Sequence, residues 1–572
     1  MKRNRLVALL VTAALSVSLL AGCGSSSSSS SDSSSDTDTE EAAEEETGEE
    51  TEEAEEAEEE SSSVVSGTDD FTAAVAAETQ ADAVTVAVDD DSFTIGPWGS
   101  EGSVRDWTEN ILWAHLAYRP YIGATLDDGL QLVAAKTVTQ VDDTTYEIEI
   151  YDNIIDSEGN AITASDVVYS YEKLKEYGYS TDIGNYYDSA EATGDYTLTM
   201  NMKSSADGVI EKLLTAASIA SEEWYENASE NDINSDPATT GAYTVTAMVA
   251  GSSVSMEARD DYWKTEDLAD SELQNVKEIN IRCITEASSR SIALENGEVD
   301  MAEISSTDVS RFEGDDNYNV TDYMNAMSQY LVFNTSENSV CQDVNVRLAI
   351  AYAFDAYTVL LGSGSDAGVM SYDVAPNLAP DYVDEWDSED YYAMDLEMSA
   401  YYLDLAGYEP GELEVHFMCS SQAPQGPYEA MQALLEQAGI TMVIDAYDRA
   451  LRSTYDSDPT MWDFKENSDT VDDFTVNFWN ALFNDENFAL GTEGFTQDDT
   501  LQELLDAANE DRSEENMNAF HDYVVENCYM IGLYTEIRSI VTQSGITDIA
   551  LECLNPTLNA MTFTSDYTTS VQ

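Results

Sequence analysis

The first 60 residues contain little that can pack into a core, so they set where a folded domain can begin. Basic residues between Lys2 and Arg5 precede an apolar run that ends in Leu20-Ala21-Gly22-Cys23. The run from Leu6 to Leu20 is too short to span about 30 Å of hydrocarbon as a helix, and small residues before a cysteine are typical of a lipoprotein signal. We therefore expect residues 1–22 to be a cleaved signal peptide. Cys23 would then carry lipid, including palmitate, and anchor the chain on the extracytoplasmic face of the cell membrane.

A serine run and then a glutamate-rich stretch to Glu60 follow this cysteine. Such a composition cannot bury enough apolar surface to offset the entropy of ordering, so we expect residues 23–70 to form a disordered tether. The like charges of the tether favour an extended chain. A tail that only improves solubility would have the same composition, so composition leaves both roles open.

Acidic residues dominate the whole chain, which has 114 Asp and Glu against 22 Lys and Arg and a formal net charge of −92. A strongly negative potential repels nucleic acid and anionic lipid, and the sequence has no basic stripe with interleaved aromatic residues. Nucleic acid is therefore excluded as a partner. The charge favours solubility, and the alternative is an acidic cleft that attracts cationic solutes.

The cysteines and histidines do not form a catalytic or metal-binding pattern. The five cysteines after Cys23 are odd in number and widely spaced, so we expect unpaired core residues, although a pair between Cys528 and Cys553 stays open. The three histidines lie far apart and no HExxH motif is present. There is no GxSxG motif, and the glycine run at residues 362–368 has the wrong spacing for a dinucleotide loop. We expect no enzymatic activity, no metal and no cofactor.

About 500 residues remain after the tether, which is enough for two or three subdomains with ordinary cores. Alternating apolar residues from Tyr146 to Ile150 and around Tyr243 and Val245 predict half-buried strands. Apolar spacing from Val344 to Leu361 predicts one amphipathic helix. Because strands and helices interleave throughout, the expected fold class is α/β.

Several sequence blocks follow one another in a fixed order between Leu132 and Asp355. They comprise a hairpin and helix start, a glycine-tyrosine hairpin, a Tyr-Trp ending, a helix with its turn, and a further helical block, at Asp142–Ile148 with Ile162–Ser170, Thr239–Val245, Asp260–Trp263, Ala293–Asp300 and Phe333–Asp355. Together these blocks resemble the extracellular dipeptide-, oligopeptide- and nickel-binding proteins of ABC importers. Within them, Thr163 or Ser165 can cap a helix that begins near Asp166, and Gly297 is suited to a positive φ after a helix end.

The resemblance implies a two-lobed periplasmic-binding-protein-like clam of type II, with an extra subdomain inserted in the first lobe. In this organisation residues 71–117, 240–325 and 528–572 form lobe I. Residues 118–239 form the extra subdomain, and residues 326–527 form lobe II. Closure of such lobes over a solute presents both of them to a permease.

The expected ligand site lies between the lobes, where aromatic side chains form walls and polar side chains anchor the solute. In the family, one segment holds an aspartate that receives the amino terminus of a peptide, and Met461 to Trp479 resembles this segment loosely. Peptide preference therefore stays open. The candidate ligand-binding residues are Trp98, Tyr330, Asn334, Trp462, Asp472, Asp473 and Trp479. Core packing is the alternative role for each aromatic residue, and a solvated loop position is the alternative for the two aspartates.

The resemblance also implies a function. We expect an extracellular solute-binding protein, a monomer, that captures a small solute, foremost a short peptide, and delivers it to the transmembrane permease of an ABC importer. One alternative is a ligand sensor or adhesion protein on the same fold, and another is a binder of an oligosaccharide or a metal chelate. The fold does not depend on what the cleft holds, so the sequence does not identify the ligand.

Overall fold

The computed structural model describes residues 73–77, 80–89, 95–98, 103–178, 180–371, 374–383, 385–386, 391–421, 423–470, 474–484, 498–552 and 555–571. All described residues belong to the unit Ser61–Gln572. The predictions for Cys23 and for the tether therefore lie outside the described residues.

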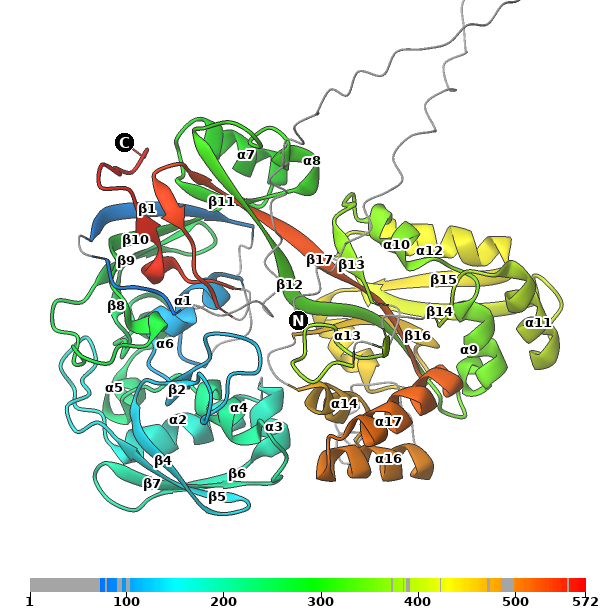
Figure 1. The fold of residues 1–572 in the computed structure, drawn as a ribbon, viewed down its shortest axis with the longest axis horizontal. Helices are drawn as coiled ribbons and strands as arrows, with labels where there is room; N and C mark the ends of the chain where they lie inside the picture. The colour runs from blue at the N-terminus through cyan, green and yellow to red at the C-terminus, as the bar shows by residue number, and fades with distance from the viewer. Residues whose placement is uncertain are drawn as a thin grey trace, which may run out of the picture. The chain divides into compact units, whose positions relative to one another are not determined.

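Among the described residues, eleven strands form one sheet whose order is β15-β14-β16-β12-β17-β11-β1-β10-β9-β8, with β13 paired to β17. Its central strands, β12 (Tyr318–Phe333) and β17 (Met530–Gln543), are long and antiparallel. Figure 1 shows them side by side, running from the part that contains β1 and β10 to the part that contains β14 and β16. We call these two parts lobe I and lobe II.

The two long strands pack in different cores at their two ends. Tyr323 and Met324 of β12 belong to the core of lobe I. Further along, Leu331 and Phe333 enter one core of lobe II, whereas Tyr330 and Val332 enter another, because successive side chains of a strand point to opposite faces. Between these ends the register shifts, since Met324 pairs with Ile537 but Ser328 pairs with Thr535. Such a bulge bends and twists a strand, so the path of β12 changes where one lobe gives way to the other.

Lobe I is built on β1, which runs parallel to both β10 and β11. The strands of its sheet are β1 (Ala81–Val88), β8 (Tyr243–Val249), β9 (Ser253–Ala258), β10 (Val276–Cys283) and β11 (Met301–Ile304). Its other elements are α1 (Ser103–Leu112), α7 (Ala287–Glu295), α8 (Ser306–Val309), β18 (Ile546–Asp548), β19 (Leu551–Glu552), β20 (Asn555–Pro556) and β21 (Thr562–Phe563). Gly297, just after α7, has a φ of 68°, as the sequence predicted.

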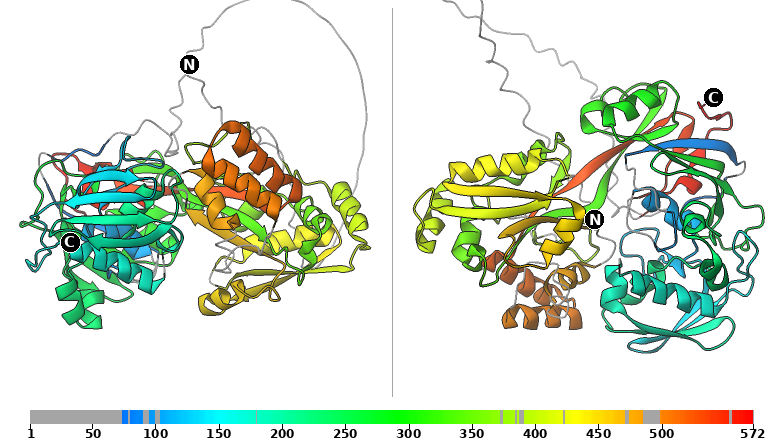
Figure 2. Two further views of the ribbon diagram at one scale, coloured as in Figure 1. Left: turned by 90° about the horizontal axis from the view of Figure 1, so that it is seen from below. Right: turned by 180° about the vertical axis from the view of Figure 1, so that it is seen from behind.

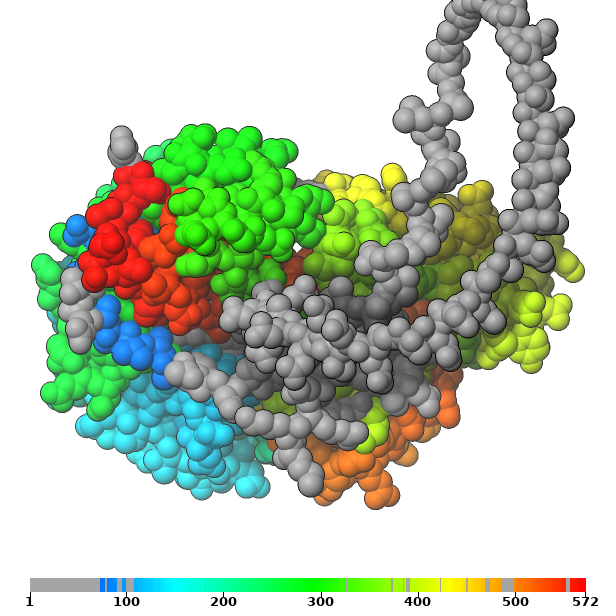
Figure 3. Space-filling view, turned by 45° about the horizontal axis from the view of Figure 1, so that its top comes forward, coloured from blue at the N-terminus to red at the C-terminus, as the bar shows by residue number. Residues whose placement is uncertain are grey.

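The C-terminal residues are fixed to lobe I by a buried carboxylate. Asp300 is fully buried, and its Oδ1 accepts hydrogen bonds from the backbone N–H and the hydroxyl of Ser570 at 2.8 and 2.7 Å. Its Oδ2 accepts from the backbone N–H of Thr85 in β1 at 2.9 Å. In the space-filling view of Figure 3 the red C-terminal segment accordingly lies against the green segment that contains α7. The last residues of the chain thus help to close the core of lobe I.

The segment between α1 and β8 forms the extra subdomain, a four-stranded sheet of order β4-β5-β7-β6 with helices beside it. Its elements are β2 (Ala117–Tyr118), β3 (Gln131–Leu132), β4 (Ala135–Asp142), β5 (Thr145–Ile150), α2 (Ala164–Tyr177), α3 (Thr181–Tyr186), β6 (Tyr187–Ala192), β7 (Thr197–Met202), α4 (Val209–Ala216), α5 (Glu222–Asn227) and α6 (Glu230–Ser235). Ile148 of β5 and Leu198 of β7 belong to the same hydrophobic core as Val84 of β1, so this subdomain is part of the first lobe.

The start of α2 confirms the predicted cap. Thr163 is the N-cap residue, and Asp166 accepts hydrogen bonds from its backbone N–H at 2.8 Å and its hydroxyl at 2.7 Å. The helix begins at Ala164, two residues before the predicted position, because Asp166 serves as the third residue of a capping box instead of the first residue of the helix.

Lobe II contains strands β13 (Gly368–Met370), β14 (Leu413–Ser420), β15 (Ile440–Tyr447) and β16 (Phe464–Thr470). Its helices are α9 (Val344–Ala351), α10 (Ala356–Gly362), α11 (Leu396–Ala406), α12 (Gly426–Gln437), α13 (Arg449–Asp456), α14 (Thr475–Phe483), α16 (Asp499–Glu510) and α17 (Glu514–Asn527). In both views of Figure 2, α16 and α17 lie beside one another as the orange helices.

The single helix predicted from Val344 to Leu361 is wrong, because the structure has two helices, α9 and α10, bent by 63° to each other. The break lies at Asp355, whose extended backbone and side chain cap the second helix: its Oδ2 accepts from the backbone N–H of Thr358 at 2.8 Å. Within the described part of the chain no single helix is long and apolar enough to cross a membrane, and only this bent pair meets that test jointly.

Candidate functional site

Charged residues gather where β12 and β17 pass from one lobe to the other. Arg538 of β17 forms ion pairs with Glu303 of β11 at 3.6 Å and with Glu536 at 3.5 Å. Tyr323 of β12 donates its hydroxyl to the same Glu303 carboxylate at 3.2 Å. Burial, reinforced by the charge of Glu303, raises the pKa of Tyr323 well above its ordinary value, so this hydroxyl stays a donor. The geometry holds a cation and two carboxylates at the edge of the bulge in β12.

A second polar group lies where the extra subdomain meets lobe II. Arg512, in the loop between α16 and α17, forms ion pairs with Asp207 of the extra subdomain at 2.7 Å and with Asp381 of lobe II at 3.3 Å. Its guanidinium carbon lies 3.7 Å from the centre of the Phe474 ring, a cation–π contact. Asp381 also accepts a hydrogen bond from the backbone N–H of Thr475 at 2.8 Å, which places it at the start of α14.

These two groups suit binding better than catalysis. Each carboxylate named above is paired with an arginine or accepts from an N–H or O–H group, and such pairs orient a ligand or another segment without supplying a nucleophile. Among the described residues no group of three or more His, Cys, Asp or Glu side chains is arranged to hold a metal ion. Both groups therefore hold segments of the chain that are distant in sequence against one another.

Two of the predicted aromatic residues are buried and use their polar atoms within the protein. Trp98 donates its indole N–H to the carbonyl of Ser218 at 2.9 Å, and its ring contacts Tyr169 and Tyr225 in the extra subdomain. Trp479, fully buried in α14, donates its indole N–H to the carbonyl of Val374 at 2.8 Å. Their predicted roles as ligand walls stay predictions.

Asn334 and Trp462, two further predicted residues, also donate their side-chain N–H groups to carbonyls within the protein. Asn334 donates its amide N–H groups to the carbonyls of Pro459 and Trp462, both at 2.8 Å. The indole N–H of Trp462 donates to the carbonyl of Tyr455 at 3.2 Å. Asn334 thus fixes the chain that enters β16, next to the segment where the sequence places the ligand.

Tyr330, in β12, accepts a hydrogen bond from the side-chain amide of Asn467 at 2.8 Å and packs its ring edge-on against Phe478. It links β16 to α14, the elements on either side of residues 471–473. Asp472 and Asp473 lie outside the described residues. The structure brings Tyr330 and Trp479 into one hydrophobic core, whereas Trp462 lies just before the start of β16 and Trp98 lies in the core of lobe I.

The sequence analysis missed Arg512, Asp207, Arg538 and Glu303. One signal was available. The chain has 114 Asp and Glu but only 22 Lys and Arg, so each arginine has several carboxylates with which it can pair. An arginine in a loop or at a lobe boundary is therefore a candidate for an ion pair between segments. The partners could not be predicted, because Asp207 and Arg512 are 305 residues apart.

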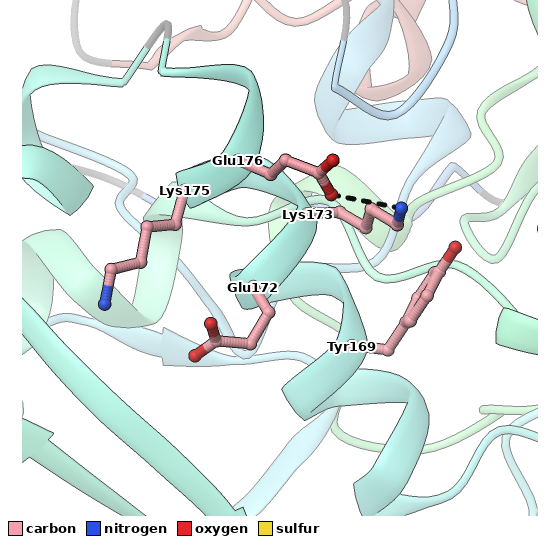
Figure 4. Close-up of a pocket in the computed structure, with 5 residues that line it drawn as sticks. All are labelled: Tyr169, Glu172, Lys173, Lys175 and Glu176. Atoms are coloured by element: carbon pink, nitrogen blue, oxygen red, sulfur yellow. Dashed lines mark hydrogen bonds and ion pairs between the residues drawn. The ribbon is translucent and has the colours of Figure 1, made fainter.

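A cavity of about 310 Å³ lies on the surface of α2 and is lined by Tyr169, Glu172, Lys173, Lys175 and Glu176 (Figure 4). Lys173 forms ion pairs with Glu176 at 3.1 Å and with Glu226 at 3.6 Å. Lys175 donates to the carbonyl of Asp188 at 2.8 Å. All five lining residues come from α2, and both lysines bind groups of the same subdomain.

A model of the family described as Bacterial extracellular solute-binding proteins, family 5 Middle, matches residues 130–491. The oligopeptide-binding protein AppA of Bacillus subtilis is 22% identical over 253 residues, which are 42% of this chain and 45% of AppA. The chain spans about half the length of the curated relatives it matches.

Solved structures show the same fold at low identity. AppA of Bacillus subtilis in complex with a nonapeptide has a TM-score of 0.69 at 16% identity and covers 85% of this chain and 100% of its own. AgaA of A. tumefaciens R10 in complex with agropinic acid has a TM-score of 0.70 at 18% identity, covering 85% and 99%. DppA of Helicobacter pylori, in complex with the peptide STSA, has a TM-score of 0.68 at 18% identity, covering 84% and 96%. The two-lobed fold of type II with an extra subdomain in the first lobe is thereby confirmed.

Proposed function

Because the chain belongs to the bacterial extracellular solute-binding proteins of family 5, we propose that it captures a short peptide between its lobes and delivers it to an ABC-type permease. The observation that carries this proposal is the continuous pair β12 and β17, which is the structural core of both lobes and is bent by a bulge between them. A pair of shared strands permits one lobe to rotate on the other, as solute capture requires. We assign the chain no enzymatic activity.

The peptide class is supported by the relatives and by charge. AppA is named an oligopeptide-binding protein, and DppA holds a tetrapeptide. A free peptide carries a cationic amino terminus as well as an anionic carboxyl terminus, and the many carboxylates of this chain offer partners for the amino terminus at short range. AgaA, which holds agropinic acid on the same fold, supports a non-peptide solute as the second candidate.

We further propose that Asp472 or Asp473 receives the amino terminus of the peptide. The support is positional, because these residues follow β16 and precede α14, whose first residues are held by Asp381 and Arg512. Losing one partner of a desolvated charge pair typically costs about 2–5 kcal/mol, whereas losing an exposed carboxylate costs a few tenths. Asp472→Asn or Asp473→Asn should therefore weaken peptide binding at least about 30-fold, which corresponds to roughly 2 kcal/mol.

A thermal-shift screen of peptide, opine and oligosaccharide libraries tests the ligand class. A ligand at 100 times its dissociation constant stabilises the folded state by about 2.7 kcal/mol. Titration calorimetry of a hit peptide and its N-acetylated form against both aspartate variants then tests amine recognition, with Asp127→Asn of the extra subdomain as the control. If only opines or oligosaccharides shift the transition, the peptide proposal is contradicted.

We also propose that the protein acts as a monomer held to the membrane by lipid on Cys23. The support is the motif Leu20-Ala21-Gly22-Cys23 and the extracellular character of the family. A Cys23→Ala chain that still incorporates labelled palmitate would contradict the anchor. Uptake of the ligand in cells that lack this chain would favour a sensing role over delivery.

A further inference from the structure

Asp207 stands at the end of a rigid turn of the extra subdomain. It precedes Gly208, the N-cap residue of α4, whose φ of 83° turns the chain into the helix. Val209, Leu213 and Leu214 of this helix are fully buried, so the position of the turn is fixed by the core of lobe I. The Asp207 side chain itself is 71% exposed and projects from that core.

Lobe II binds Asp207 at two points. Nη2 of Arg512 lies 2.7 Å from the carboxylate, and the side-chain amide of Asn477 donates to the backbone carbonyl of Asp207 at 3.1 Å. Arg512 is only 22% exposed, because it is held from behind by Asp381 and stacks on Phe474. One residue of the extra subdomain is thus recognised through both its main chain and its side chain by a site that lobe II forms from α14 and the α16–α17 loop.

We infer that Asp207 and Arg512 form a clasp that holds the two lobes closed, with Arg512 as the positioning residue. Asp381 and Phe474 orient the guanidinium within lobe II, so less side-chain entropy is lost when Asp207 arrives than for a free arginine. The inference rests on the proposed function only in that closure is the step that retains a solute.

The strength of the clasp should depend on ionic strength. Asp207 is largely exposed, so its attraction to Arg512 is screened as the Debye length falls from about 8 Å at physiological salt to about 3 Å at 1 M. Exposed ion pairs are individually weak, and we expect loss of the clasp to change the ratio of closed to open molecules by about fivefold.

The test measures the distance between lobes in the full chain without ligand. Fluorophores are attached through non-natural amino acids at two exposed positions, Val141 of the extra subdomain and Tyr401 of lobe II, and single-molecule energy transfer is recorded. We expect Asp207→Asn and Arg512→Gln each to lower the ratio of high-transfer to low-transfer molecules about fivefold, and the double variant to lower it no further. Raising NaCl from 0.15 M to 1 M should lower this ratio in the wild type and leave Asp207→Asn unchanged.

Arg311→Gln is the matched control, because Arg311 pairs with Glu295 at 2.6 Å entirely within lobe I. Asp207→Asn alters only an exposed carboxylate, so it should leave the fold intact. Unfolding curves of all variants check that each one is folded. The clasp is refuted if both variants give the distance distribution of Arg311→Gln, or if salt acts equally on the wild type and Asp207→Asn. Because no ligand is present, a failed ligand screen would leave this result intact.

Discussion

At the scale of single residues, His521 of α17 is a titratable group enclosed by aromatic rings. Its side chain is fully buried and stacks on Trp386 at 4.4 Å with the planes 3° apart. Nδ1 lies 3.4 Å from the Asp522 carboxylate, and Nε2 has no hydrogen-bond partner among the described residues. Burial lowers the pKa of His521 to about 4, against the opposing pull of Asp522. The ring is therefore neutral at physiological pH.

This burial predicts a loss of stability in acid. Between the folded pKa of about 4 and the ordinary value of about 6.5, the unfolded chain binds a proton at His521 that the folded chain does not. The free energy of unfolding should therefore fall as pH drops through this window, by up to about 3 kcal/mol. His521→Phe keeps a ring against Trp386 and removes the titration, so urea unfolding at pH 7 and pH 4.5 should show a smaller acid loss than the wild type.

His416 offers the matched comparison. It is half exposed, and its hydrogen bond with Asp445 at 2.7 Å raises its pKa. A raised pKa gives stability that is present in acid and lost at higher pH, the opposite sign from His521. His416→Phe should not reduce the loss of stability between pH 7 and pH 4.5. An equal acid loss in the wild type and His521→Phe would contradict the assignment to His521.

At the scale of elements, α10 and α12 of lobe II meet at two glycines without any side chain between their backbones. A Cβ on Gly426 would lie 2.0 Å from the carbonyl oxygen of Gly362, and a Cβ on Gly362 would lie 2.6 Å from the carbonyl oxygen of Gly426. Both distances are below any real carbon–oxygen contact. The close approach of the end of α10 to the start of α12 therefore depends on glycine for space.

Gly426→Ala should force the two helices apart and lower the free energy of unfolding by about 1–3 kcal/mol, as overpacking does in other cores. Gly184→Ala is the control, because a Cβ at Gly184 in α3 meets nothing within 4 Å. There the added methyl should be neutral or slightly stabilising, since alanine restricts the unfolded chain. If both substitutions change the free energy of unfolding in denaturant equally, the contact between α10 and α12 accommodates a methyl group without loss of stability, and the prediction is wrong.

At the scale of the whole molecule, every described residue of the folded body lies after Glu60. The first described strand, β1, is central to lobe I because it pairs with both β10 and β11, and its Val84 and Val86 are fully buried. The boundary that matters for folding therefore lies between Glu60 and Ala81.

Deletion of residues 24–60 should leave the unfolding midpoint of the body unchanged and its affinity for any hit from the ligand screen within about threefold. A segment whose only apolar side chains are those of alanine has too little apolar surface to share a core with the body. Deletion of residues 24–90, which also removes β1, should abolish cooperative unfolding of lobe I. Calorimetry of both truncations checks this. Loss of binding in the shorter deletion would show that the acidic tract takes part in recognition.

Features set by residues near one another in the chain could be predicted from sequence. Thr163 with Asp166 at the start of α2 and Gly297 after α7 follow from the local needs of a helix end, which any tertiary context must meet. The two-lobed fold followed from ordered blocks that resemble a family. The break at Asp355 was missed because the apolar spacing continues across it, and an aspartate within such a pattern looks like an ordinary polar position until its side chain is seen to cap α10.

Only the tertiary structure decided which side chains face one another across the lobes. The sequence around Trp98 and Trp479 does not distinguish a residue that lines a cleft from one that fills a core. In the structure their hydrogen bonds to Ser218 and Val374 place them among buried neighbours. Arg512 and Asp207 carry no local pattern at all. Their contact exists because α4, which follows Asp207, and the helices α16 and α17 on either side of Arg512 are fixed by separate cores whose positions depend on the entire chain. Long-range pairing is therefore set by packing and not by sequence proximity.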